Sequence, residues 1–187
     1  MASSLIIKVV FFSLTSMALI YVSRSSLRVP LTHGLPRFFA WEAIIALFLL
    51  NLEHWFRNPF FMNQILSWSF LVISLVLILL GSWTLRVLGK PGVSREDDTL
   101  LAIEKTTNLV TGGIYHFIRH PFYSSLLFLA WGIYLKNMSW FGMILVIVAT
   151  VCLVFTAVIE EREDIIFFGP VYREYMHVTK RFIPFLF

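Results

Sequence analysis

The chain has 187 residues and is strongly apolar: 58% of them are hydrophobic, 14% are charged, and the mean hydropathy is +0.81. This composition excludes a soluble globular protein and predicts a single all-α domain, a bundle of about five transmembrane helices. The net charge of +4 at pH 7 comes from basic residues scattered along the chain rather than gathered in a stripe, so we expect no nucleic-acid partner.

Three apolar stretches of near-bilayer length fill the first half of the chain, at residues 5–22, 38–56 and 64–88. The first contains Lys8, close enough to one end for its charged head to reach the interface. A cleavable signal peptide is the alternative for this stretch, but it lacks a preceding basic region and a clear cleavage site. The second stretch contains polar side chains that should face the bundle interior or the interface: Glu42, Asn51, Glu53 and His54.

A helix-breaking segment of Gly, Lys and Pro at residues 89–92 follows the third stretch. The fourth apolar stretch, residues 122–135, is short for a full crossing. We therefore expect it to be tilted, to be extended by its flanks, or to form half of a hairpin that turns at residues 136–139.

The fifth apolar stretch covers residues 141–159 and ends at two adjacent carboxylates, Glu160 and Glu161. Its helix should continue to Phe168, because the Gly-Pro pair at residues 169–170 is the first signal that ends it. A helix from residue 141 to residue 168 would be about 42 Å long, so Glu160 should lie near the membrane surface.

The distribution of basic residues predicts the orientation, because cytoplasmic loops carry an excess of Lys and Arg. With five spans, 12 of the 15 basic residues fall on one side, which predicts an external N-terminus and a cytoplasmic C-terminus. The same side then carries the acidic pair, even if the last two stretches form only a re-entrant hairpin. The 12 residues are Arg24, Arg28, Arg37, Arg86, Lys90, Arg95, Lys105, Arg119, Arg162, Arg173, Lys180 and Arg181.

The most informative motif is GIYHFIRHPFY at residues 113–123, just before the fourth stretch. Charged groups at the edge of an apolar segment are costly unless they are paired or used. Pro121 has no N–H and a preset φ angle, so it should occupy the first turn of a helix, with His120 next to the cap. The free N–H groups of that turn, beside Arg119 and His120, would suit an anion such as a carboxylate.

These residue types together suit S-adenosylmethionine, a zwitterion with an additional sulfonium. Arg119 and His120 would bind its carboxylate, and Glu160 would bind its ammonium. The rings of Tyr115 and Tyr123 would contact its cationic and aromatic parts. Considered alone, however, charged residues of these types near a membrane surface are more often interfacial anchors or topology signals.

The C-terminal half of the chain resembles the superfamily of membrane-embedded isoprenylcysteine carboxyl methyltransferases and phospholipid methyltransferases. The resemblance covers about 80 residues, and its elements occur in the family's order. They are residues 109–115 (LVTGGIY), residues 119–123 (RHPFY), Glu160-Glu161, residues 167–169 (FFG), Tyr172, Tyr175 and residues 181–185 (RFIPF).

The resemblance implies S-adenosylmethionine bound between the motif loop, the final hairpin and a folded-back tail, with access from the cytosol for the cofactor and from lipid for the substrate. With the apolar stretches, it divides the chain into three N-terminal spans, residues 1–88, in which we find no motif of the family, and a cofactor-binding half, residues 89–187. Glu161, Tyr172 and Tyr175 are expected to support or pack against the pocket. The complete set of candidate cofactor-binding residues is Asn108, Leu109, Val110, Tyr115, Arg119, His120, Pro121, Phe122, Tyr123, Glu160 and Glu161.

The methyl acceptor stays open. Isoprenylcysteine enzymes have an Arg one turn before the acidic pair, where this chain has Thr156. Four acceptors stay possible: a prenylcysteine, a phospholipid amine, a small thiol or a quinone-like hydroxyl. The sequence does not identify a catalytic base. An NADPH-dependent membrane reductase of the sterol type and a non-catalytic membrane protein are the alternatives. The single Cys152 predicts no disulfide, and we expect no metal site.

Overall fold

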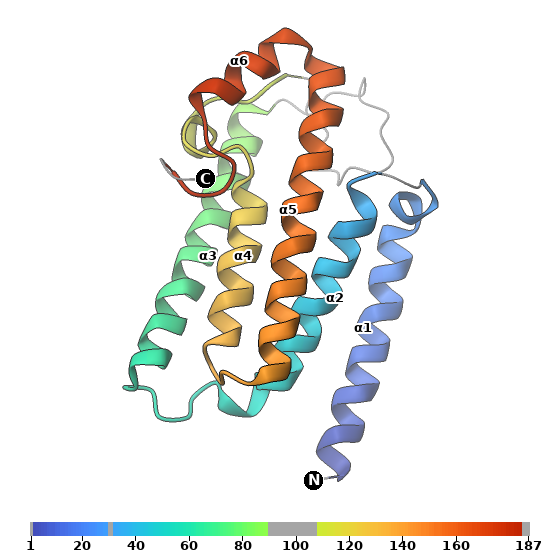
Figure 1. Ribbon diagram of the computed structural model, residues 1–187, viewed down its shortest axis with the longest axis vertical. Helices are drawn as coiled ribbons and strands as arrows, with labels where there is room; N and C mark the ends of the chain where they lie inside the picture. The colour runs from blue at the N-terminus through green and yellow to red at the C-terminus, as the bar shows by residue number, and fades with distance from the viewer. Residues whose placement is uncertain (1, 30–31, 90–107, 185–187) are drawn as a thin grey trace.

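The computed structural model describes residues 2–29, 32–89 and 108–184, with side chains from residue 5 onward. The described part is a bundle in which α1 to α5 run side by side, while α6 lies across the end where α5 stops (Figure 1). It contains one isolated β-bridge and no named strand, so the prediction of an all-α fold is confirmed. The elements are α1 (Ala2–Arg28), α2 (Gly34–Asn51), η1 (Leu52–His54), α3 (Met62–Leu88), η2 (Gly113–His116), α4 (Pro121–Tyr134), α5 (Trp140–Phe168) and α6 (Pro170–Val178), where η denotes a 3₁₀ helix.

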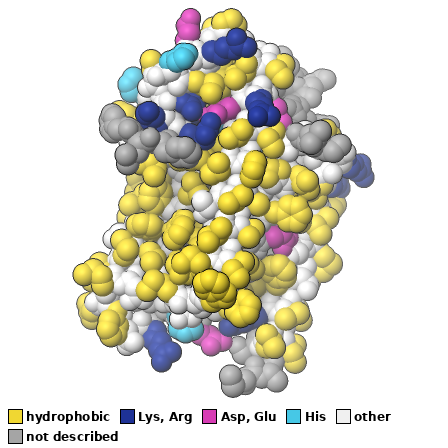
Figure 2. Space-filling model, viewed as in Figure 1, with side chains coloured by type: hydrophobic (Ala, Val, Ile, Leu, Met, Phe, Trp, Pro, Cys, Tyr) yellow, Lys and Arg dark blue, Asp and Glu magenta, His cyan; other side chains and the backbone are white. Residues whose placement is uncertain are grey.

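Among the described residues, four helices are long and apolar enough to span a bilayer: α1, α2 with η1, α3 and α5. Apolar side chains form a broad belt around the middle of the molecule, and charged side chains gather at both ends (Figure 2). The chain is therefore an integral membrane protein. Which end faces the cytosol stays a prediction, and three of the basic residues behind it, Lys90, Arg95 and Lys105, lie outside the described residues.

Helix α4 has 14 residues and is thus only about 21 Å long, as its short apolar stretch predicts. A turn over residues 135–139 connects it to α5, so α4 and α5 form a hairpin. It also packs along α3 and is enclosed between α3 and α5 (Figure 1).

The core lies where α2, α4 and α5 meet, and its centre includes small side chains such as Ala40, Ala130 and Ala149, all fully buried. Small residues at such contacts let helix backbones approach closely, which drives helix association in a membrane. Two polar side chains of the second span face the interior, as the sequence predicts: Glu42 accepts a hydrogen bond from Ser16 at 2.7 Å, and Asn51 is fully buried. Asn51 donates to the carbonyl of Ile133 at 3.0 Å.

Helix α5 continues through Glu160 to Phe168 and ends at Gly169, whose φ of 67° is in the left-handed region that favours glycine. Pro170 then begins α6. This confirms the predicted end of the long helix. The last turns of α5, residues 160–168, extend beyond the apolar stretch and carry four carboxylates: Glu160, Glu161, Glu163 and Asp164.

One of these carboxylates fixes the connection between α1 and α2. His33 is fully buried, and its Nδ1 lies 2.5 Å from the Oε2 atom of Glu163. Burial alone would lower the pKa of His33 and Arg37 opposes protonation, but the hydrogen bond to Glu163 and the charges of Glu160 and Glu163 raise the pKa above its usual value.

We expect this pair to make the stability of the protein depend on pH. Folding raises the pKa of His33, so protonated His33 adds to the free energy of unfolding. This contribution is complete below the unfolded pKa of about 6.5 and is lost as the pH rises through the folded pKa. Thermal unfolding in detergent should therefore show a falling midpoint from pH 6 upward. The His33→Gln variant should lose much of this slope, and an unchanged slope would contradict the assignment.

Candidate functional site

The candidate site lies at the α6 end of the bundle, where α3, η2, α4, α5 and α6 converge (Figure 1). Acidic and basic side chains gather on this end above the apolar belt (Figure 2). A pocket opens between them, and segments far apart in the sequence line it. The lining residues are Leu85, Leu109, Val110, Tyr115, Arg119, His120, Pro121, Phe122, Tyr123, Glu160, Asp164, Phe168, Tyr172 and Tyr175.

The structure brings nine of the eleven candidate cofactor-binding residues to this pocket. The other two lie elsewhere: Asn108 is exposed and outside the lining, and the Glu161 side chain is buried away from the cavity. Successive residues on a helix point about 100° apart, so the adjacent Glu160 and Glu161 cannot share one direction.

The motif loop takes its shape from glycine and proline. Gly113 has φ of 59°, and a Cβ atom there would lie 2.7 Å from the Thr84 hydroxyl of α3, so no other residue fits without movement. The resulting η2 turn buries Tyr115. Pro121 then occupies the first position of α4, as predicted, and no side chain caps that helix start.

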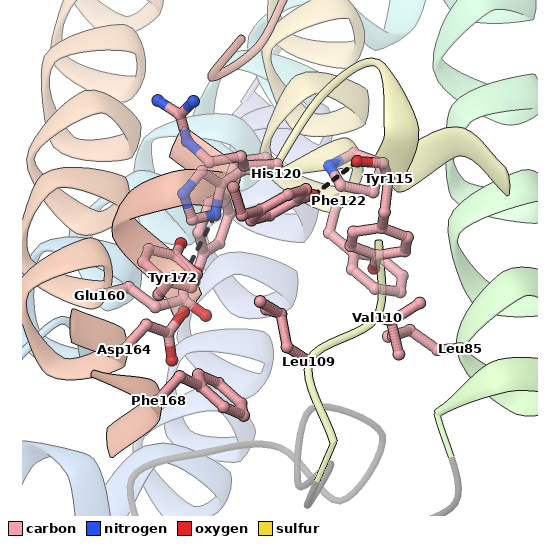
Figure 3. A pocket seen from close by; sticks show the side chains of 14 residues that line it. Leu85, Leu109, Val110, Tyr115, His120, Phe122, Glu160, Asp164, Phe168 and Tyr172 are labelled. Atoms are coloured by element: carbon pink, nitrogen blue, oxygen red, sulfur yellow. Dashed lines mark hydrogen bonds and ion pairs between the residues drawn. The ribbon is translucent and has the colours of Figure 1, made fainter. Parts of the chain in front are cut away.

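Helix α5 forms one wall of the pocket, and its lining residues recur every four positions. Glu160, Asp164 and Phe168 are spaced four residues apart, so they lie on one face of the helix and all line the pocket. Figure 3 shows their side chains opposite Leu85 and Val110. Asp164 and Phe168 were not among the residues predicted from the sequence, although their four-residue spacing from Glu160 is a signal that could have found them.

His120 lies between the two acidic residues of the pair. Its Nδ1 is 3.6 Å from the Oε2 of Glu160, and its Nε2 is 3.4 Å from the Oε1 of Glu161. The imidazole also stacks on Tyr123, with ring centroids 5.4 Å apart. His120 therefore contacts both the pocket carboxylate and the buried one.

Glu161 is the centre of an ion-pair cluster that we call the tail latch, consisting of Glu161, Arg119 and Arg181. The Nε of Arg119 donates to Oε1 of Glu161 at 2.9 Å, and the Nη2 of Arg181 donates to Oε2 at 2.6 Å. The hydrogen bond to Glu161 raises the pKa of Arg181. Arg119 also donates to the carbonyls of Met176 and Thr179.

The guanidinium of Arg119 is thus engaged by the protein itself. The sequence predicts that Arg119 binds a ligand carboxylate, and that role stays a prediction. In the structure its Nε and Nη1 groups hold the C-terminal tail against the motif loop. Arg119 still forms part of the pocket wall.

Backbone bonds complete this attachment of the tail. The N–H groups of Arg119 and His120 donate to the carbonyls of Lys180 and Arg181, at 2.8 and 3.1 Å. Tyr175 of α6 donates its hydroxyl to the carbonyl of Tyr115 at 2.6 Å. Burial raises the pKa of Tyr175 and also of Tyr172, so both phenols stay protonated. The tail is therefore a wall of the pocket.

A second cavity, which we call the apolar groove, lies next to the pocket among α3, α4, α5 and the tail. Its volume is about 340 Å³, and its lining is Phe70, Ser124, Leu127, Phe128, Trp131, Thr150, Val154, Phe182 and Ile183. Ser124 follows the pocket residue Tyr123, and the Phe182 ring lies 6.2 Å from the His120 ring, centroid to centroid. A charged pocket and an apolar groove thus adjoin at the start of α4.

Comparison with known proteins agrees with this arrangement. A family model described as phospholipid methyltransferase matches residues 62–165, which is more than half of the chain. The match runs from the first residue of α3 to the turns of α5 that hold Glu160 and Asp164. No curated protein and no solved structure gives a significant match. The chain belongs to the phospholipid methyltransferase family, within the superfamily of membrane methyltransferases that its motifs resemble.

Proposed function

We propose that this membrane methyltransferase transfers a methyl group from S-adenosylmethionine to a lipophilic acceptor. The observation that carries the proposal is one pocket in which two carboxylates, Glu160 and Asp164, face aromatic side chains and adjoin an apolar groove. Family membership supports methyl transfer over the NADPH-dependent reductase that the sequence left open.

The residues of the pocket fit the proposed donor. Glu160 and Asp164 supply negative charge for an ammonium, and rings such as Tyr115, Phe122 and Phe168 offer faces to a sulfonium and an adenine. The uncapped first turn of α4 is the seat we propose for the carboxylate, because Arg119 is engaged in the tail latch. The remaining sequence candidates in the lining keep their proposed role as cofactor contacts.

The free space in the pocket is about 90 Å³, whereas sites for drug-sized ligands have about 300–1,000 Å³. Binding of a nucleoside-sized donor therefore requires rim side chains to move outward. Leu109 is half-buried at this rim, and Phe168 lies at the end of α5, so both are placed to move.

The donor supplies an activated methyl group, and the protein supplies alignment. Transfer breaks the carbon–sulfur bond, leaves the electron pair on sulfur and forms a bond from the methyl carbon to the acceptor atom. In-line positioning of the acceptor accounts for much of the rate in such a step. Glu161 is a poor candidate for a base, because two guanidinium groups hold its carboxylate. An amine acceptor would then release its proton to water.

The apolar groove favours a lipophilic acceptor over a small polar one. Except for Ser124 and Thr150, its lining is hydrophobic, and residues such as Phe70 and Trp131 lie within the apolar helices α3 and α4. An acyl or prenyl chain in the groove would bring its polar head beside His120 and Tyr123. We also propose, from the distribution of basic residues, that this end of the bundle faces the cytosol.

Two measurements on the protein in detergent test the proposal. Calorimetric titration should show heat with S-adenosylmethionine and none with NADPH. Incubation of native membranes with methyl-labelled donor should then place label in the lipid extract. Absence of donor binding, or tighter binding of NADPH, would overturn the proposed function, and label only in small soluble products would overturn the lipophilic acceptor.

A further inference from the structure

A polar pocket lies at the opposite end of the bundle from the methyltransferase site, and we call it the far-face pocket. It is formed by the α2–α3 connection, the start of α3 and the turn between α4 and α5, and its volume is about 210 Å³. Gln64 in the first turn of α3 is about 30 Å from Leu85 near the other end of that helix. The two pockets are therefore on opposite faces of the membrane.

The lining of the far-face pocket is basic and rich in amides. Arg57 and Lys136 supply two cationic side chains, His54 is beside them, and no Asp or Glu is among the described residues that line it. Glu53, the neighbouring acid, forms an ion pair with Lys8 at 2.9 Å. Charge complementarity therefore favours an anionic ligand.

Lys136 gives an independent indication of a ligand. The residue is only 2% exposed, yet within the described residues its ammonium donates a single hydrogen bond, to Oε1 of Gln64 at 3.2 Å. Its Nζ also lies 3.7 Å from the centroid of the Trp68 ring. An ammonium has three donors, and a buried charge is costly unless it is paired with an anion. Burial lowers the pKa of Lys136, which is the shift that a bound anion would offset.

Two more polar groups at this pocket lack a full set of partners in the described structure. The Nδ1 atom of His54 is buried and has no hydrogen-bond partner there. The guanidinium of Arg57, in contrast, is exposed and makes no side-chain hydrogen bond or ion pair within the described residues. Three nitrogen-bearing groups thus surround one cavity with unused capacity to bind an anion.

The surroundings of the pocket place it at the level of lipid headgroups. Three apolar side chains beside the pocket are largely exposed: Phe56 (80%), Phe60 (90%) and Met62 (79%). Exposure of so much apolar surface would be unfavourable in water. Trp68 and the exposed Trp140 lie at the same end of the bundle, as expected of an aromatic belt. A phosphate in the pocket could therefore belong to a lipid whose chains lie along these side chains.

We propose that the far-face pocket binds an anionic phosphate group, that of a phospholipid in the leaflet opposite the methyltransferase site. This inference does not depend on the proposed function. The phosphate would accept hydrogen bonds from Lys136 and Arg57 and would neutralise the buried ammonium.

Native mass spectrometry of the detergent-purified protein tests the proposal with three probes. These are dioleoyl phosphatidylglycerol, a diacylglycerol with the same chains and no phosphate, and inorganic phosphate as a competitor. We expect one strongly retained phosphatidylglycerol and no retained diacylglycerol. Displacement by millimolar phosphate would show that the site recognises free phosphate as well, whereas persistence would identify the lipid as the ligand.

Arg57→Gln should weaken this retention about tenfold, and Lys136→Met, which keeps an apolar stem beside Trp68, should weaken it at least as much. Because Arg57 is exposed, its variant should stay folded even if the Lys136 variant does not. The matched control is Lys8→Gln combined with Glu53→Gln, which removes an ion pair at the same face, outside the pocket lining, and leaves the net charge there unchanged. Equal retention of diacylglycerol, or equal losses in the control and Arg57 variants, would overturn the proposal.

Discussion

Replacement of Glu161 by glutamine is expected to destabilise the protein by about 3–5 kcal/mol, the usual cost of breaking a buried ion pair. The variant keeps the shape of the side chain but leaves Arg119 and Arg181 without their shared anion. The side chains of Glu161 and Arg119 are only 4% and 8% exposed, so water cannot replace the lost partner. We expect a much lower thermal unfolding midpoint in detergent and faster proteolysis of the tail.

Glu174→Gln is the matched control, because Glu174 is an exposed carboxylate on α6. It should leave the midpoint and the proteolysis pattern unchanged. If the Glu161 and Glu174 variants unfold at the same temperature, the tail latch does not hold the C-terminal segment in place.

In contrast to Glu161→Gln, the Glu160→Gln variant should bind the methyl donor more weakly but keep a nearly unchanged midpoint of thermal unfolding. Glu160 lines the pocket, and the proposed ammonium contact is a charge-assisted hydrogen bond of about 1.5–3 kcal/mol. We therefore expect the affinity for S-adenosylmethionine, measured by calorimetry, to fall about tenfold to a hundredfold. Asp164→Asn should also weaken binding.

The Glu160 and Glu161 variants serve as controls for each other. Glu160 and Glu161 are adjacent, so a general effect of removing charge at this end of α5 would act on both. Unchanged donor affinity in the Glu160 and Asp164 variants would show that the donor site is elsewhere. His120→Ala should lower both affinity and stability, because His120 lies close to both carboxylates.

Much of the fold follows from the sequence because its signals are local. The apolar stretches predict the long helices, and their polar ends set the limits to within a few residues. Pro121 predicts the start of α4, and Gly169 predicts the end of α5. The division into residues 1–88 and 89–187 stays a prediction; α3 belongs to the first part, yet Leu85 and Thr84 shape the pocket.

The candidate site was also largely predictable, because its motif residues are consecutive around one turn. Nine of its residues were identified from the motif and the acidic pair. Asp164 and Phe168 share the helix face of Glu160, but a single sequence does not show how far along α5 the cavity extends. The ion pair between Arg119 and Glu161 was not predicted, because the two residues are 42 positions apart in the chain.

By itself, therefore, the sequence determined the membrane class, the helices and the segments that form the site, since apolarity and backbone preferences act over a few residues. Only the tertiary structure decided the roles of individual charges. Packing of α5 against α2 and α4 sets its rotation, and that rotation turns Glu160 into the pocket and Glu161 toward Arg119 and Arg181. An isolated helix has no preferred rotation, so the partner of each charge depends on contacts between distant parts of the chain.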